Sequence, residues 1–164
     1  MSEKTIRQAI VDAIVSVEST GEVYDHVPWA STFDVVLDKF RIMEEGKQLL
    51  RGFTVSMVEM SQTGKITQTS SGTDIRSYSY EVLGFQSVKT STDEVPPDNR
   101  GNDSENQFLE IVLDVMAELD KTNLSTFRRP RCQLDNYRAD MVGSVLSHVA
   151  TIVIPNVEEE VDCD

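Results

Sequence analysis

The stretch RSYSYEVLGFQSV, residues 76–88, carries apolar side chains on both faces of an extended chain. Tyr78, Tyr80 and Val82 share one face, and Leu83 and Phe85 share the other, because successive strand residues point to opposite sides. A strand that is apolar on both faces is typical of the centre of a sheet. The segment therefore predicts a central strand, in which Gly84 marks a candidate β-bulge.

The segments around this strand alternate between helical and extended patterns. Apolar residues recur at three- and four-residue steps over residues 5–18, from Ser31 or Thr32 to Phe40, and over residues 104–120. Extended patterns cover residues 22–29, 52–60, 132–141 and 142–154, the last of which we expect Pro155 to end. Hairpins with helices between them predict an α+β fold: a mainly antiparallel sheet of four to five strands, with two main helices packed on one face and a short extra helix.

Polar segments separate these elements. Residues 61–74 are rich in Ser, Thr and Gly, and predict either a mobile loop or the polar tip of a long hairpin. The loops expected at 61–77 and 89–103 are long for a small domain, and loops of that length are often binding loops. We therefore expect one domain over residues 1–155, followed by a flexible acidic tail at 156–164.

The amino-acid composition and net charge limit the classes of protein to which the chain could belong. The chain has 164 residues, of which 15 are Lys or Arg and 28 are Asp or Glu, so its formal net charge is −13. This charge repels duplex DNA and disfavours a sequence-reading nucleic-acid binder. The apolar runs are too short for a membrane helix, and the first residues lack an apolar signal core. A soluble protein made in the cytoplasm is therefore expected.

No constellation of residues predicts a catalytic, cofactor or metal site. His148 lies in a strand pattern without the context of a nucleophile, so we expect a hydrogen-bonded structural histidine. Asp34 and Asp38, four residues apart, could bind a hard cation but more often form a solvated helix face. Cys132 and Cys163 are expected to be free thiols. The glycines form no phosphate-binding motif.

Four arginines lie close together in this acidic chain: Arg128, Arg129, Arg131 and Arg138. The net charge argues against a nucleic-acid patch. Arginine binds carboxylates in a bidentate manner and is enriched at interfaces, so these residues are a candidate inter-subunit or partner interface. Pairing with acids of the same chain, such as Asp135, is an equally supported alternative.

The order of segments carries one further indication. A first helix leads to VYDHVPWASTFDVVLDKF (23–40) and to a strand that opens GFTVSM (52–57). RSYSYEVLGFQSV is followed by a polar loop, the helix ENQFLEIVLDVMAEL (105–119), the strand VLSHVATIVIP (145–155) and an acidic end. This order resembles the tail terminator (tail completion, minor tail) proteins of long-tailed bacteriophages. The resemblance covers nearly the whole chain and rests on general pattern, without a diagnostic motif.

The resemblance implies a structural virion protein that is assembled in the host cytoplasm as a hexameric ring. Such a ring caps the polymer of tail tube protein, stops its growth, and presents the surface that joins the head through a connector or stopper protein. DNA passes through the lumen without specific binding. Neither catalysis nor a cofactor, metal or membrane is implied. Two alternatives stay open: another phage neck component, such as a head–tail joining or minor tail protein, and, more remotely, a small metal-dependent enzyme.

Overall fold

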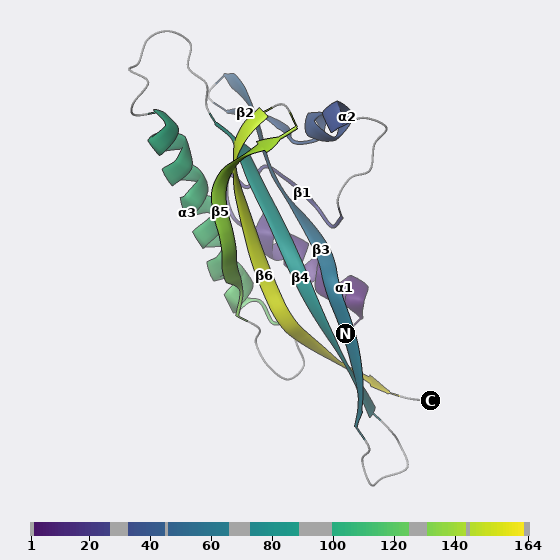
Figure 1. Ribbon diagram of the computed structural model, residues 1–164. Helices are drawn as coiled ribbons and strands as arrows, with labels where there is room; N and C mark the ends of the chain where they lie inside the picture. Colours follow the sequence, from purple (N-terminus) through teal and green to yellow (C-terminus); the bar gives the residue numbers. More distant parts are fainter. Residues whose placement is uncertain are drawn as a thin grey trace.

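Six strands form one mixed sheet in the computed structural model, which describes residues 2–26, 33–44, 46–65, 73–88, 100–124, 131–143 and 145–162 (Figure 1). The strands are β1 (Glu22–Tyr24), β2 (Arg41–Glu44), β3 (Lys47–Lys65), β4 (Thr73–Ser87), β5 (Gln133–Val142) and β6 (Val145–Asp162). Their order is β1-β3-β4-β6-β5, and β2 pairs with β3 beside this path. β4 therefore lies in the middle of the sheet, as its two apolar faces predicted.

The predicted sheet of four to five mainly antiparallel strands is wrong. β1 pairs with β3 in parallel, with Glu22 opposite Gly52, and β2 pairs with β3 as an antiparallel hairpin, so the sheet is mixed and has six strands. Short strands caused the error. The pattern of residues 22–29 gave no direction of pairing, and no pattern predicted β2. β2 ends at Glu44 and β3 begins at Lys47, and Gly46 before β3 has a φ of +74°.

Three helices accompany the sheet: α1 (Glu3–Val15), α2 (Phe33–Asp38) and α3 (Arg100–Lys121). α1 and α3 lie on the same face of the sheet (Figure 1). The Ser2 hydroxyl accepts a hydrogen bond from the Thr5 backbone N–H and caps α1, which begins two residues before the pattern at 5–18 predicted. Likewise α3 begins at Arg100, four residues before the pattern at 104–120 predicted.

The main hydrophobic core fills the space between the sheet and these two helices. It contains Ile6, Ile10 and Ile14 of α1, Phe108, Val112, Val115 and Leu119 of α3, and Phe53, Val55, Tyr78, Tyr80, Val82, Ile152 and Ile154 of the sheet. Gly84 belongs to a regular register and not to a bulge. The Phe53 ring lies where a side chain at Gly84 would stand, so the missing Cβ permits this packing.

A smaller core lies on the opposite face of the sheet, beneath α2. Leu37 and Phe40 pack there against Leu50 of β3 and Phe85 of β4. The rings of Phe40 and Phe85 meet edge to face, with centroids 4.9 Å apart. α2 covers only one end of this face, so its helix layer is much smaller than that of α1 and α3.

The long strands extend further than the sequence patterns predicted. β3 and β4 pair from Arg51–Gln86 to Lys65–Thr73, so the hairpin alternative for residues 61–74 is confirmed, and the loop expected at 61–77 is wrong where these strands are described. β6 continues past Pro155 to Asp162, so the expected end at Pro155 is wrong, and residues 156–162 of the expected tail belong to the sheet. Of the loop expected at 89–103, residues 89–99 lie outside the described residues, and 100–103 begin α3.

Candidate assembly interface

β3, β4 and β6 together form a three-stranded extension of the sheet, which we call the arm. The arm consists of residues 59–65 of β3, 73–79 of β4 and 157–162 of β6. Figure 1 shows it reaching past the ends of α1 and α3. β4 is its central strand and pairs antiparallel with both neighbours. The arm therefore has two outer edges, one on β3 and one on β6.

β-bulges separate the arm from the body of the sheet. Val58 is an extra residue on β3, between Met57, which pairs with Tyr80, and Glu59, which pairs with Ser79. On β6, the pairing with β4 shifts between Ile154 and Val157. The interval contains Pro155 and Asn156, whose φ is +55°. Because bulges bend a strand and increase its twist, both outer strands change direction at the root of the arm.

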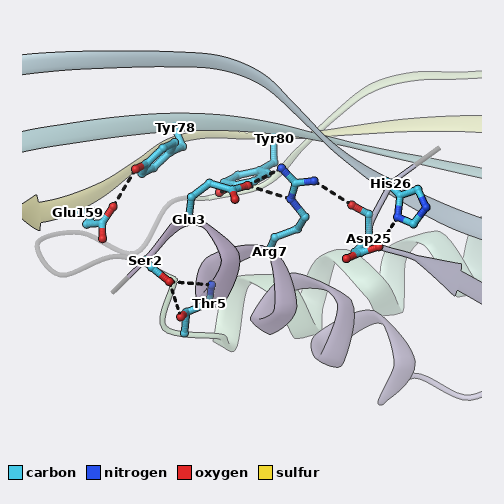
Figure 2. Close-up of polar contacts among 9 residues, drawn as sticks. All are labelled: Ser2, Glu3, Thr5, Arg7, Asp25, His26, Tyr78, Tyr80 and Glu159. Carbon is cyan, nitrogen blue, oxygen red and sulfur yellow. Dashed lines mark hydrogen bonds and ion pairs between the residues drawn. The ribbon is translucent and has the colours of Figure 1, made fainter. Parts of the chain in front are cut away.

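Two tyrosines of β4 anchor this root in a cluster of polar contacts (Figure 2). On the arm side, the Tyr78 hydroxyl donates to Glu159 Oε2 over 2.8 Å, and both side chains are buried. On the body side, the fully buried Tyr80 reaches Glu3 Oε1 over 3.5 Å. Burial is the largest cause that raises the pKa of both tyrosines. These hydroxyls therefore remain protonated donors.

The same cluster fixes the beginning of α1 beside the arm. Arg7 pairs with Glu3 one turn earlier, with Nη2 2.5 Å from Oε1, and Arg7 Nη1 donates to the backbone oxygen of Asp25 over 3.2 Å. Asp25 in turn contacts His26 through its side chain (Figure 2). Glu3 thus connects α1 to Tyr80 of the central strand, and Arg7 connects α1 to the segment that follows β1. The arm consequently begins at a firmly held part of the body.

Each edge of the arm has a row of backbone groups without a strand beside it among the described residues. On β3, β1 pairs only with residues 52–54 and β2 only with residues 47–50, so the outer side is open from residue 55 to 65. On β6, β5 pairs only with residues 145–153, so the outer side is open from residue 154 to 162. Open edges are ready-made sites for pairing with another chain.

The two edges differ in chemistry. The β3 edge exposes three large apolar side chains at the root of the arm: Met57, Val58 and Met60, with exposed fractions of 39%, 56% and 58%. The β6 edge has the sequence VEEEVD at 157–162, with four carboxylates in six residues, of which Glu159 is buried against Tyr78. Natural proteins usually blunt a free edge with charge, proline or a bulge. β6 has all three of these features, whereas the exposed methionines and valine of β3 favour contact with a partner.

The predicted arginine interface is described only in part. Arg128 and Arg129 lie outside the described residues, and Arg131 is exposed just before β5. Arg138 pairs within the chain, with Nη2 2.7 Å from Asp140 Oδ2, and both side chains are about half exposed. A hydrogen bond from the Met141 N–H, followed by the contacts with Arg138, lowers the pKa of Asp140. Arg138 therefore pairs within the chain, with Asp140 in place of the suggested Asp135.

A buried polar network beneath α3 was missed by the sequence reasoning. Arg51 of β3 is 1% exposed, and its Nε donates to Gln86 Oε1 of β4 over 2.6 Å. Gln86 Nε2 donates to the backbone oxygen of Ser104 over 3.2 Å, and the Ser104 hydroxyl lies 2.8 Å from His148 Nε2. His148 is thus a buried, hydrogen-bonded residue, as predicted. Only the cross-strand register of positions 51, 86 and 148 reveals this network, and that register is not visible in the sequence.

The surroundings of Cys132 also indicate a structural role. Its thiol is buried and lies 3.2 Å from both Asp120 Oδ1 and the backbone oxygen of Met116. Burial, followed by the hydrogen bond to Asp120, raises the pKa of the Cys132 thiol to about 12. Such a thiol is a poor nucleophile at neutral pH. Cys163 lies outside the described residues.

Comparison with known proteins finds no matching family model and no matching curated protein. Within the described part of the chain, no three His, Cys, Asp or Glu side chains gather in a way that could hold a metal ion. None of the described helices combines the length and the apolar character needed to cross a membrane. The open edges of the arm are accordingly the strongest candidate for a functional surface.

Proposed function

We propose that this chain is a structural subunit of a phage virion, which assembles as a ring on the end of the tail tube. The ring stops tube polymerisation and provides the surface that joins the head. The segment order that resembles tail terminator proteins supports the proposal. One observation of the fold gives the proposal its main support: a single sheet has two open edges whose side chains differ in chemistry.

Open edges of this kind suit a ring. A closed ring of identical subunits needs two different surfaces on each copy, which meet head to tail. The apolar β3 edge and the acidic β6 edge lie on opposite sides of β4 and meet this requirement. The expected partners are further copies of the chain, the tail tube protein, and a connector or stopper protein of the head.

The net charge suits the proposed passage of DNA. Six copies would carry about six times the charge of −13, and carboxylates facing a lumen repel the phosphate backbone. DNA would then slide past the wall without binding to it. Tight binding of duplex DNA to the isolated protein at physiological salt would contradict this part of the proposal.

Electron microscopy tests the proposal in two steps. Negative-stain images and native mass spectrometry of the purified protein should show rings, or a monomer–ring equilibrium that depends on concentration. Phage particles made without the protein should contain tail tubes of excessive length. Tubes of normal length that fail to join heads would instead identify a different neck component, and a protein that stays monomeric and leaves tail tubes unbound would contradict the role.

A further inference from the structure

The two edges of the arm match each other in length and level. Ser61 of β3 and Glu158 of β6 pair with the same residue of β4, Ser77. At the tip, Lys65 and Asp162 both pair with Thr73. Each edge therefore runs from a bulge at the root to the tip, and spans the same stretch of the central strand. If two arms lie side by side at the same height, residues 59–65 of one copy stand beside residues 157–162 of the next.

The direction of the strands fixes how such edges would pair. β3 and β6 are both antiparallel to β4, so they run parallel to each other, toward the tip of the arm. A rotation about an axis along the strands keeps that direction. In a ring with this axis, β6 of one copy would therefore lie parallel to β3 of its neighbour, in an evenly spaced parallel ladder.

Charge selects this pairing over the pairing of two identical acidic edges. Two β6 edges side by side would bring together the carboxylates of two VEEEVD segments, which repel each other. The β3 segment EMSQTGK at 59–65 has one acid and one lysine, and is therefore close to neutral. Along it, Met60 and Ser61 are exposed to solvent. An acidic edge is thus better placed beside the β3 edge than beside a copy of itself.

From this geometry we propose that neighbouring copies join through their arms, with β6 residues 157–162 of one copy forming a parallel strand pair with β3 residues 59–65 of the next. The inference rests on the ring of the proposed function and specifies the seam between its subunits. The bulges at Val58 and at Pro155–Asn156 end the ladder at the root of the arm. The strand-paired part of the seam is therefore confined to the arm and joins the arms into one continuous wall.

Disulfide crosslinking tests this seam. In a Cys163→Ser background, Ser61→Cys and Glu158→Cys are combined in one chain and oxidised with copper phenanthroline, while the buried Cys132 is retained. We expect a ladder of crosslinked species that ends at the closed ring. Mixing the two single variants should give crosslinked dimers only, and neither single variant should crosslink alone. A matched pair of exposed residues away from the arm, Leu113→Cys with Met43→Cys, should give no ladder.

A second test needs no cysteine at Glu158. Ser61→Glu adds a charge of the same sign as the acidic β6 edge, so it should raise the protein concentration required for assembly about tenfold, which corresponds to about 1.4 kcal/mol. Ser61→Lys, at the same exposed position, should assemble at least as well as the parent chain. Added salt should reduce the difference. Equal effects of the two substitutions would overturn the charge argument and the seam.

The outcomes separate the seam from the proposed function. Rings that form without the Ser61–Glu158 crosslink would overturn the seam while leaving tube capping intact. Crosslinking of Ser61→Cys by itself would overturn it too, since it would indicate two β3 edges related by a two-fold axis. Crosslinked rings that fail to cap tail tubes would support the seam and contradict the function.

Discussion

Arg51 donates to both carboxylate oxygens of Glu44, with Nη1 3.1 Å from Oε1 and Nη2 3.0 Å from Oε2. The arginine side chain is 1% exposed, while that of Glu44 is 22% exposed. Arg51 also reaches the backbone oxygen of Ser19 after α1, and Gln107 of α3 donates to Glu44. One ion pair therefore ties the β2–β3 hairpin to both helices and to the central strand.

Replacing Arg51 with alanine should lower the free energy of unfolding by about 3–5 kcal/mol, because it removes one partner of a buried ion pair. Urea unfolding monitored by circular dichroism measures the loss. Arg138→Ala is the matched control, since that arginine forms an exposed pair with Asp140, and it should leave the free energy of unfolding nearly unchanged. Equal losses for the two variants would contradict a special role of Arg51.

Gly52→Ala should destabilise the fold by about 1–3 kcal/mol, the usual cost of overpacking. A Cβ at this position would collide with the Phe40 ring and with the backbone oxygen of Glu22, which pairs with Gly52 across β1 and β3. Ser56→Ala, in the same strand at a half-buried position, should change stability by about 0.5 kcal/mol or less. Denaturant midpoints of the two variants compare the costs.

Stability should fall as the pH drops below about 6.5, the ordinary pKa of histidine. Burial lowers the pKa of His148 in the folded chain, although Glu105 acts in the opposite direction. The unfolded chain therefore binds a proton at a higher pH, and the stability present above pH 6.5 is lost toward the folded pKa. Urea midpoints at pH 7.5 and 5.5 measure this loss. His148→Gln should reduce it, whereas substitution of the exposed His26 should preserve it.

Cys132 should resist alkylation by iodoacetamide at pH 8 in the folded protein. Its thiol is buried, and its pKa is raised to about 12, so the thiolate is scarce. Mass spectrometry of peptides from treated protein measures the modification. The same treatment in denaturant should modify Cys132 fully. Rapid modification of Cys132 under native conditions would show that the packing between α3 and β5 opens readily.

Charge reversal at Arg128 and Arg129 tests the interface inferred from the sequence. The double variant Arg128→Glu, Arg129→Glu should weaken ring assembly without lowering the melting temperature of the subunit, because it would repel acids of a neighbour. Arg138→Ala is the comparison, since Arg138 already pairs with Asp140. Native mass spectrometry compares the ring fractions. Normal assembly of the double variant would remove Arg128 and Arg129 from the interface.

The sequence patterns located the long elements because those elements bury periodic apolar faces. Tyr80 and Phe85 on opposite faces identified β4 as central, and Ile6 and Ile10 marked the buried face of α1. The direction of strand pairing and the ends of the strands were harder to predict from the sequence. Three-residue β1 has no pattern that distinguishes parallel from antiparallel pairing, and the β6 sequence after Pro155 was too acidic to suggest a strand. Both Val157 and Glu159 are nevertheless buried there: Val157 belongs to the main hydrophobic core, and Glu159 accepts a hydrogen bond from Tyr78.

The candidate interface depends on pairing between strands that lie far apart in the sequence. The exposed Met57, Val58 and Met60 are visible in the sequence, but their position on an open edge follows from the short reach of β1 and β2. The cluster of arginines was conspicuous in the sequence, yet Arg138 pairs locally. Charge and hydropathy thus identified unusual residues, whereas pairing between distant strands determined which surfaces are open.

The position of β6 between β4 and β5 also governs how the chain can fold during synthesis. Tyr80 of β4 pairs with Ile154, and Thr73 pairs with Asp162. The edge of β4 that pairs with β6 therefore remains open until β6 has emerged from the ribosome. Pairings so distant in sequence slow folding, and a half-built apolar sheet is prone to aggregate meanwhile. Nascent chains halted at Pro155 should therefore be captured by chaperones, and the proposed ring could form only after the acidic strand has paired with β4.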